Sequence, residues 1–182
     1  MKRRTFLQTT AAAVPLITLA PLGAAGASAE QPFVVKAGRS RRNEVLTFRQ
    51  VNSQDVKVST ADTGGVLSVL EYTGREKTGP PLHVHYEQDE VFYVVEGQYR
   101  FVVGGEQFVA AAGDTVFLPR NVPHTWIQLT ETGRQLYLLQ PAGQFEAFLR
   151  TMQNLKQVPT AEELQRIHLA HGMRVLGPPL QL

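Results

Sequence analysis

The chain has 182 residues, enough for one domain with a substantial core, and its 43% hydrophobic and 19% charged residues exclude a disordered or low-complexity protein. A pI near 9.0 would suit a nucleic-acid partner, but the basic excess is confined to the N-terminus. Lys2, Arg3 and Arg4 precede the first acidic residue, and without these three the 18 basic residues fall to 15, against 16 acidic ones. No basic stripe with interleaved aromatic residues follows, so we expect no nucleic-acid partner.

The first 29 residues have the order of an export signal. The charged start KRRTFLQ is followed by an alanine-rich, mildly apolar stretch and by the small residues Ala27-Ser28-Ala29. The pair Arg3-Arg4 resembles the twin-arginine signal, so we expect export by the twin-arginine machinery to the periplasm or the medium. A membrane anchor is the alternative, but two prolines make it the less favoured one. We therefore predict a signal peptide over 1–29 and one domain over 30–182.

The chain between residues 33 and 140 is a series of short β-branched and aromatic runs separated by turn residues. We predict strands at 44–51, 65–73, 90–97, 99–105, 106–111, 115–119, 124–130 and 134–140. Gly104-Gly105 suits a two-residue hairpin, because glycine accepts positive φ. Short strands at regular spacing are typical of an antiparallel sandwich or barrel, so we predict an all-β fold. The chain has no cysteine, so only its core, or its core and a metal ion, can hold this fold together.

The C-terminal part, from about residue 142, changes to a helical period. In 142–155 the apolar side chains recur at helical spacing, which predicts an amphipathic helix packed against the sheet; they are Phe145, Phe148, Leu149 and Met152. A second helix is indicated by Thr160 and Glu163, which form a capping-box pattern, and by Gly172 at its end. We expect His168 and His171, near that end, to be solvated.

One stretch, PPLHVHYEQDEVFYVVEG at 80–97, combines metal-ligand residues with a strand pattern. Side chains alternate along a strand, so His83 and His85 point to the same side. After a short link, Glu90 can begin the next strand and face the same interior, whereas Asp89 should face outward. Two imidazoles and a carboxylate on one side suit a divalent transition metal.

A second stretch, GDTVFLPRNVPHTWIQ at 113–128, supplies a further ligand-type residue. Asn121 accepts a left-handed bend better than most residues, and His124 then begins a strand. If the two stretches pair inside a barrel, His124 completes a site of three histidines and Glu90. Unpaired, each such group would cost about 1–3 kcal/mol to bury, so we favour a metal site over an empty polar cluster.

These two motifs resemble those of the cupin superfamily, specifically small single-domain cupins. The first motif matches at His83, His85, Glu90 and Gly97, and the second at Gly113, Pro119 and His124. The departures are Lys77, Asn121 and Gln128, which replace two glycines and an asparagine and are not ligands. The resemblance covers roughly 45–140 and implies a jelly-roll β-barrel with C-terminal helices. It also implies one divalent metal ion, which could be manganese, iron, nickel, cobalt, copper or zinc.

The expected substrate pocket follows from the strand faces. Tyr72 or Leu70, with Phe92 and Trp126, would form an apolar aromatic wall, and Gln128 would add a polar group. Such a wall suits a small aromatic or enolic substrate better than a sugar phosphate.

The tail HGMRVLGPPL resembles small cupins similar to quercetin 2,3-dioxygenase. That resemblance implies cleavage of a flavonol-like substrate by dioxygen, with Glu90 as the catalytic base. Two alternatives stay open: a non-oxygenase metalloenzyme, such as an isomerase or lyase, and a metal-containing binding protein without turnover. A homodimer is a further expectation.

Overall fold

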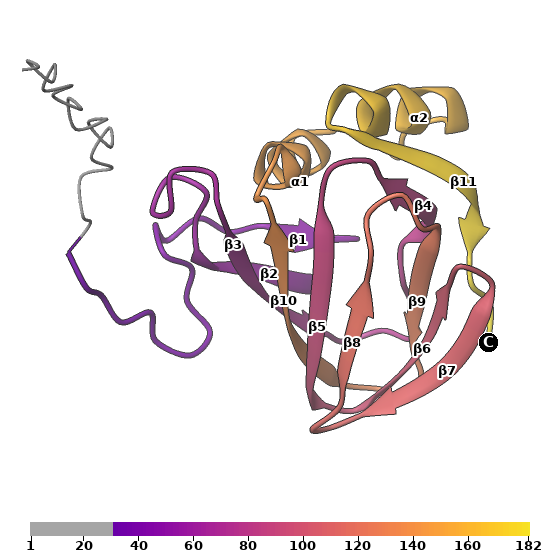
Figure 1. Ribbon diagram of the computed structural model, residues 1–182, viewed down its shortest axis with the longest axis horizontal. Helices are drawn as coiled ribbons and strands as arrows, with labels where there is room; N and C mark the ends of the chain where they lie inside the picture. Colours follow the sequence, from indigo (N-terminus) through magenta and orange to yellow (C-terminus); the bar gives the residue numbers. More distant parts are fainter. Residues whose placement is uncertain (1–30) are drawn as a thin grey trace, which may run out of the picture.

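The structure is a computed structural model, and it describes residues 31–182. The predicted signal peptide lies outside these residues. Within residues 31–182, no helix is both long and apolar enough to span a membrane. The chain forms two antiparallel β-sheets that face each other, with two helices at one end (Figure 1).

The two sheets interleave along the sequence. The six-stranded sheet has the order β1 (Thr47–Phe48), β2 (Asn52–Val58), β3 (Ser68–Gly74), β10 (Gly133–Gln140), β5 (Asp89–Glu96) and β8 (Thr115–Leu118). The five-stranded sheet has the order β11 (Met173–Pro179), β4 (Pro81–His85), β9 (His124–Gln128), β6 (Gln98–Val103) and β7 (Glu106–Ala111). The predicted all-β jelly-roll barrel with C-terminal helices is confirmed.

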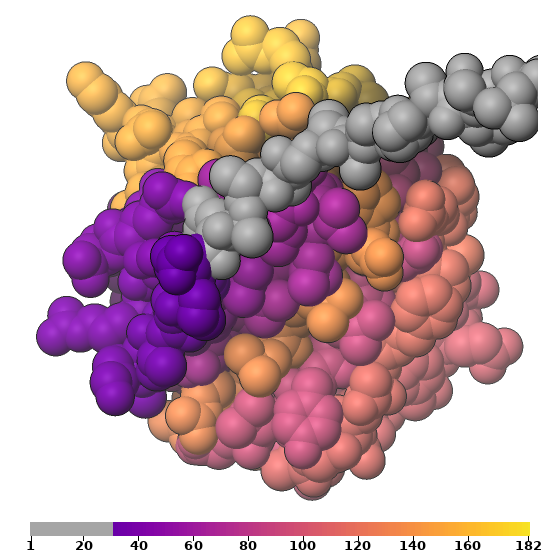
Figure 2. Space-filling model, turned by 60° about the vertical axis from the view of Figure 1, so that its left-hand side comes forward, coloured from indigo at the N-terminus to yellow at the C-terminus, as the bar shows by residue number. Residues whose placement is uncertain are grey.

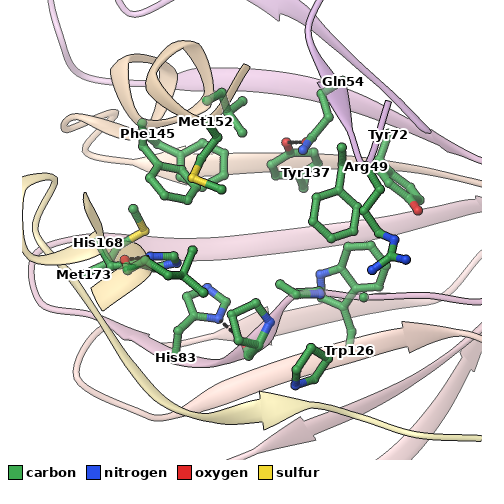
Figure 3. Close-up of a pocket in the computed structure, with 18 of the residues that line it drawn as sticks. Arg49, Gln54, Tyr72, His83, Trp126, Tyr137, Phe145, Met152, His168 and Met173 are labelled. Atoms are coloured by element: carbon green, nitrogen blue, oxygen red, sulfur yellow. Dashed lines mark hydrogen bonds between the residues drawn. The ribbon is translucent and has the colours of Figure 1, made fainter. Parts of the chain in front are cut away.

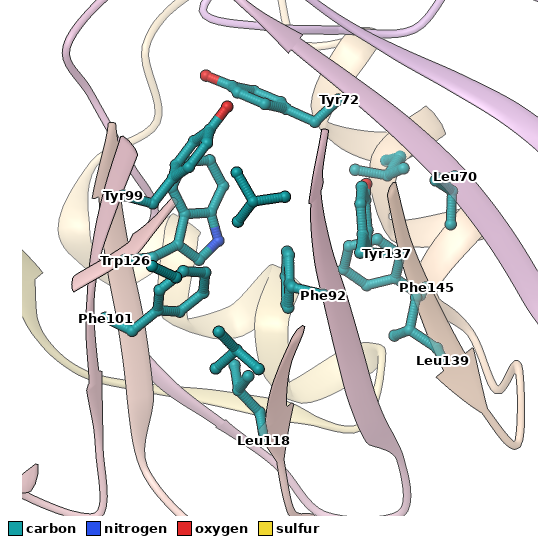
Figure 4. Packing of buried hydrophobic residues seen from close by; sticks show 14 of the residues in the cluster. Leu70, Tyr72, Phe92, Tyr99, Phe101, Leu118, Trp126, Tyr137, Leu139 and Phe145 are labelled. Carbon is teal, nitrogen blue, oxygen red and sulfur yellow. The ribbon is translucent and has the colours of Figure 1, made fainter. Parts of the chain in front are cut away.

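The interior is filled by the inward-facing residues of both sheets. Alternation along β3 buries Leu70 and Tyr72, and β5 buries Phe92 in the same way. The Phe92 ring lies between Trp126 and Tyr137, with centroid distances of 6.3 and 5.2 Å (Figure 4). These aromatic rings form the floor on which the candidate site rests.

The turns follow the sequence pattern closely at one hairpin and depart from it at another. Gly104 and Gly105 connect β6 to β7 with φ of 60° and 94°, as predicted. The predicted strand over 44–51 is confirmed only at β1, Thr47–Phe48, because Arg49 and Gln50 adopt φ of 54° and 65° and turn the chain there. The chain then returns as β2, a polar strand over 52–58 that was not predicted.

Two helices and a last strand close one end of the barrel. The predicted helices are confirmed as α1 (Phe145–Gln153) and α2 (Ala161–Ala170), and the Thr160 side chain accepts a hydrogen bond from the Glu163 amide at 3.2 Å. The unpredicted strand β11 then runs back along β4. Figure 2 shows this C-terminal part, in orange and yellow, over one end of the molecule beside the N-terminal part of the described chain.

Candidate metal centre

Three histidines and one glutamate meet inside the barrel, where the two sheets face each other. His83 and His85 lie on β4, and His124 pairs with His83 across from β9. Glu90 lies at the beginning of β5 in the opposite sheet. All four are buried, and the three imidazole centroids lie 4.6 to 5.4 Å apart. The strand geometry expected from the two motifs is therefore present.

Each imidazole in this cluster is held through its Nδ1 atom. The Nδ1 atoms of His83 and His124 donate to the carbonyl oxygens of Pro81 and Val122, at 2.8 and 2.9 Å. The Nδ1 atom of His85 donates to Oε1 of Gln88 at 3.1 Å. A carbonyl oxygen can only accept, so in each neutral ring the proton lies on Nδ1 and the lone pair on Nε2.

The free Nε2 atoms test whether these residues fit a metal ion. Those of His85 and His124 are buried without a hydrogen-bond partner, although buried polar atoms are usually paired. The three histidines place ligand atoms within 4.8 Å of one another, so they could hold a metal ion. The Glu90 carboxylate lies 3.5 Å from Nε2 of His85 and 3.7 Å from Nε2 of His124. Lone pairs that converge beside a carboxylate fit a divalent transition metal.

The electrostatics of the cluster favour neutral imidazoles. Burial, and then the neighbouring histidines, lower the pKa of His83 well below its usual value and that of His85 to about 3. Burial lowers the pKa of His124 to about 4. Burial also raises the pKa of Glu90 to about 8. Protons therefore compete little for the histidines at neutral pH, whereas Glu90 must lose a proton to act as a ligand.

The turn that carries Arg120 and Asn121 is hydrogen-bonded to β5 at Asp89 and to β4 at His85. Asp89 faces outward, as predicted, and accepts hydrogen bonds from the Arg120 amide and guanidinium at 2.6 to 3.1 Å. Asn121 adopts φ of 62°, the predicted left-handed bend, and its amide donates to the His85 carbonyl oxygen at 2.7 Å. These contacts fix Glu90 and His124 relative to His85.

The side chain of Gln88 orients His85. Its Nε2 atom donates to the Ala142 carbonyl oxygen at 2.7 Å, which turns its Oε1 atom toward His85. A Cβ atom at Gly143 would lie 2.6 Å from that Nε2 atom, so Gly143 leaves the room that Gln88 needs. Partners of this kind orient metal ligands and raise their basicity.

A cavity of about 380 Å³ opens beside the cluster, and His83 and Glu90 form part of its wall (Figure 3). The rest of the wall is mainly apolar and aromatic. The barrel contributes Phe48, Tyr72, Phe92, Trp126 and Tyr137, and the C-terminal part contributes Phe145, Phe148, Leu149, Met152, Leu164 and Met173. The predicted apolar face of α1 thus does more than pack against the sheet, because all four of its apolar residues line this cavity.

The predicted pocket residues divide into two groups. Tyr72, Phe92 and Trp126 line the cavity, whereas Gln128 does not. Gln128 is fully buried at the other end of β9, where its Nε2 atom donates to the Thr130 carbonyl oxygen at 2.9 Å. Strand alternation correctly predicts that Gln128 points to the same side of β9 as Trp126. The cavity, however, extends along β9 only as far as Trp126.

His168 belongs to the cavity, contrary to the expectation of a solvated side chain. It is only 4% exposed and lines the cavity, with its ring centroid 6.3 Å from that of His83. The sequence carried a signal for this position: Leu164, Ile167 and His168 lie at i, i+3 and i+4, on one face of α2. That face covers the barrel, so the helix turns His168 inward.

Another position clarifies the departure at Lys77. Gly79 lines the cavity, and a Cβ atom there would lie 1.7 Å from the Trp126 carbonyl oxygen. The main chain therefore approaches β9 at Gly79 more closely than any side chain would allow. A glycine is needed near the start of the first motif, two residues after the expected place.

Residues 70–138 match the family model described as a cupin domain. A segment of 97 residues is 27% identical to quercetin 2,3-dioxygenase of Bacillus subtilis (strain 168) and covers 53% of this chain. The same segment is only 28% of the length of that relative. The match thus supports a cupin domain related at low identity to part of a quercetin 2,3-dioxygenase.

Solved structures agree on the fold. KdgF from Halomonas sp. superposes with a TM-score of 0.51 at 16% identity, over 62% of this chain and 94% of its own. An RmlC-like cupin from Shewanella frigidimarina NCIMB 400 gives a TM-score of 0.51 at 19% identity, over 63% and 95%. At these identities the likeness establishes the cupin jelly roll and leaves the activity to the site itself.

Proposed function

We propose that this protein is a metal-dependent dioxygenase that acts on a small enolic aromatic molecule such as a flavonol. The observation that carries the proposal is the meeting of His83 and Glu90 with an apolar, aromatic cavity. Sites for small organic ligands typically combine such walls with a few convergent polar groups. The name of the Bacillus subtilis relative, quercetin 2,3-dioxygenase, is in keeping with this class of substrate.

In this proposal His83, His85, His124 and Glu90 hold one divalent transition metal ion. When bound, the ion would supply Lewis-acid polarisation of a substrate oxygen and redox chemistry with dioxygen. The chain contributes three imidazoles whose Nε2 lone pairs are fixed by the hydrogen bonds at Nδ1. It also contributes apolar walls, which would orient the ring system and limit the access of water to the reacting atoms.

Glu90 has a second role as the base that takes the proton of the substrate's enolic hydroxyl group. It lines the cavity, and burial raises its pKa to about 8. A carboxylate with a raised pKa, once ionised, is a stronger base than an exposed one. Phe92 and Trp126, in the same wall, would hold the aromatic ring beside it.

The experiment that tests this function has two steps. The metal content of the purified protein is determined by mass spectrometry, and oxygen uptake is then measured with quercetin. We expect one metal ion per chain and quercetin-dependent oxygen uptake. His124→Ala should lower metal affinity by more than about 100-fold, since even outer partners of a ligand contribute 10- to 100-fold. His171→Ala is the matched control, because His171 does not line the cavity and should leave the metal content unchanged.

Three results would contradict the proposal, each in a distinct way. Full metal occupancy in His124→Ala would show that the metal is bound elsewhere. Quercetin conversion at an undiminished rate under nitrogen would indicate a non-oxygenase enzyme, such as an isomerase or lyase. Tight binding of quercetin that is recovered unchanged in air would indicate a binding protein without turnover.

A further inference from the structure

His168 places a polar ring in an otherwise apolar part of the cavity wall. It projects from α2, and its ring makes an edge contact with Phe148 at a centroid distance of 4.7 Å. In Figure 3, His168 and Met173 lie on one side of the cavity, and Arg49 and Tyr72 lie on the other. His168 therefore faces the space where a ligand would lie, close to His83 but on a different element.

The hydrogen bonding of His168 leaves one nitrogen free. Its Nδ1 atom is 2.7 Å from the Leu164 carbonyl oxygen, which can only accept, so Nδ1 donates and carries the proton. In the neutral ring Nε2 is then an acceptor. No residue in 31–182 forms a hydrogen bond with this Nε2 atom. A neutral His168 can therefore accept a hydrogen bond from a ligand.

Most other polar groups of the wall already have protein partners. Tyr137 donates to Gln54, and Thr47 donates to Gln153 at 2.9 Å. Arg49 lies 3.4 Å from a carboxylate oxygen of Glu76.

The Tyr72 hydroxyl has no partner, but it is sealed within the packing and is not accessible. The Nε2 atom of His168 is therefore an acceptor in the cavity wall that no residue in 31–182 occupies.

We propose that His168 is a positioning residue that accepts a hydrogen bond from a hydroxyl group of the substrate, beside the candidate metal centre but outside its ligand set. It selects aromatic substrates that carry a ring hydroxyl group in addition to the enolic one. The substrate class rests on the proposed function, whereas the acceptor in the cavity wall rests on the contacts of α2 alone. A buried acceptor discriminates in this way because a substrate without the hydroxyl group leaves it unpaired.

The test compares two probes and two matched variants. Quercetin carries several ring hydroxyl groups, whereas 3-hydroxyflavone has only the enolic one. Binding of each probe to the protein is titrated by fluorescence under nitrogen, which excludes dioxygen. The protein is loaded with zinc, because zinc has no redox chemistry and so leaves the probe unchanged. The variants are His168→Phe and His171→Phe. His171 is the control because its Nδ1 atom makes the same contact, 2.7 Å from the Ile167 carbonyl oxygen, outside the cavity.

We expect His168→Phe to weaken quercetin binding roughly tenfold and 3-hydroxyflavone binding by less than about twofold. His171→Phe should change neither probe by more than about twofold. His168→Gln, which restores an acceptor, should recover part of the quercetin affinity. Zinc content and melting temperature, measured on each variant, separate this effect from misfolding.

An equal loss for both probes, or no loss for quercetin, would overturn the assignment of His168. A wild-type protein that binds neither probe would overturn it together with the proposed substrate class. The two proposals are otherwise separable. If His168→Phe weakened quercetin binding selectively but quercetin caused no oxygen uptake, the dioxygenase proposal would fail and the role of His168 would stand. If quercetin caused oxygen uptake but His168→Phe did not weaken its binding selectively, the dioxygenase proposal would stand and the role of His168 would fail.

Discussion

Two buried carboxylates in this protein have opposite surroundings. Glu90 is 3% exposed and Glu146 is 5% exposed, so burial alone does not distinguish them. Glu146 lies on α1 and accepts hydrogen bonds from the Thr60 amide and hydroxyl at 2.6 and 2.8 Å, from Ser68 at 2.7 Å and from Arg150 at 3.2 Å. Glu90 accepts none from residues 31–182 and faces the Nε2 atoms of His85 and His124.

The pKa values follow from this difference. At Glu146 burial raises the pKa, but the hydrogen bonds from Thr60, Ser68 and Arg150 outweigh it and the pKa is lowered. At Glu90 burial acts alone and raises the pKa to about 8. The comparison teaches that a buried carboxylate belongs to the structure when its acceptors are filled. It is prepared for a ligand when its neighbours turn lone pairs toward it.

The largest expected effect concerns turnover. Glu90→Gln keeps the shape and removes the base, so oxygen uptake per bound metal should fall by about 10²–10⁴-fold. Glu146→Gln, the matched control, should retain turnover per folded, metal-loaded protein within about threefold, because Glu146 does not line the cavity. Equal losses in the two variants would mean that Glu90 acts only through the structure.

The next effect concerns metal affinity. Gln88→Ala removes the acceptor that orients His85, so zinc affinity should fall by about 10- to 100-fold. Competition with a chelator of known affinity measures the change. Gln107→Ala, on the exposed part of β7, should leave the affinity unchanged. If Gln88→Ala bound zinc as tightly as the wild type, the hydrogen bond at His85 would have no role in ligand orientation.

A smaller effect concerns stability, and here the substitution of Glu146 should be more damaging than the substitution of Glu90. In the metal-free protein at pH 7, Glu146→Gln should lower the free energy of unfolding by about 1–3 kcal/mol, because donors aimed at a carboxylate lose their acceptor. Glu90→Gln should instead raise it, because Glu90 with a folded-state pKa of about 8 must take up a proton when the chain folds at pH 7, whereas glutamine is neutral in both states. Urea denaturation followed by circular dichroism gives both values, and a larger loss for Glu90→Gln would contradict this comparison.

The smallest effect is a proton count. Because the folded-state pKa of Glu90 is about 8, the metal-free protein carries this proton at pH 7 and must release it when Glu90 becomes a ligand. Zinc binding at pH 7 should therefore release about one proton, and the number should fall toward zero as the pH rises above 8. Calorimetry in buffers of different ionisation enthalpy measures the number. Glu90→Gln should release no proton on zinc binding. If both proteins released the same number of protons, Glu90 would be excluded as their source.

Much of the fold and the grouping of the candidate ligands could be predicted because both depend on local patterns. Alternating apolar residues specify which face of a strand is buried, and so they placed His83 and His85 together. The left-handed bend at Asn121 followed from the tolerance of asparagine for that conformation.

What escaped prediction depends on contacts between distant segments. The polar strand β2 forms because it pairs with β3, which no propensity within 52–58 indicates. His168 is buried because α2 packs onto the barrel, and Gln128 lies outside the cavity because the cavity ends at Trp126. The limits of a cavity depend on every wall at once, so a single strand pattern cannot give them.

The cavity is built by the barrel and by the C-terminal segment together, and this division has an evolutionary consequence. The candidate metal ligands and the aromatic floor come from residues 72–137, whereas much of the opposite wall comes from 145–179. Mutation or exchange of the C-terminal segment can therefore change which molecule is accepted without altering any ligand atom. Lineages that share the ligand motifs should diverge in substrate chiefly through this last segment. A chimera that carries the tail of another cupin should therefore differ in the ligands that it accepts and keep the candidate metal ligands of the barrel.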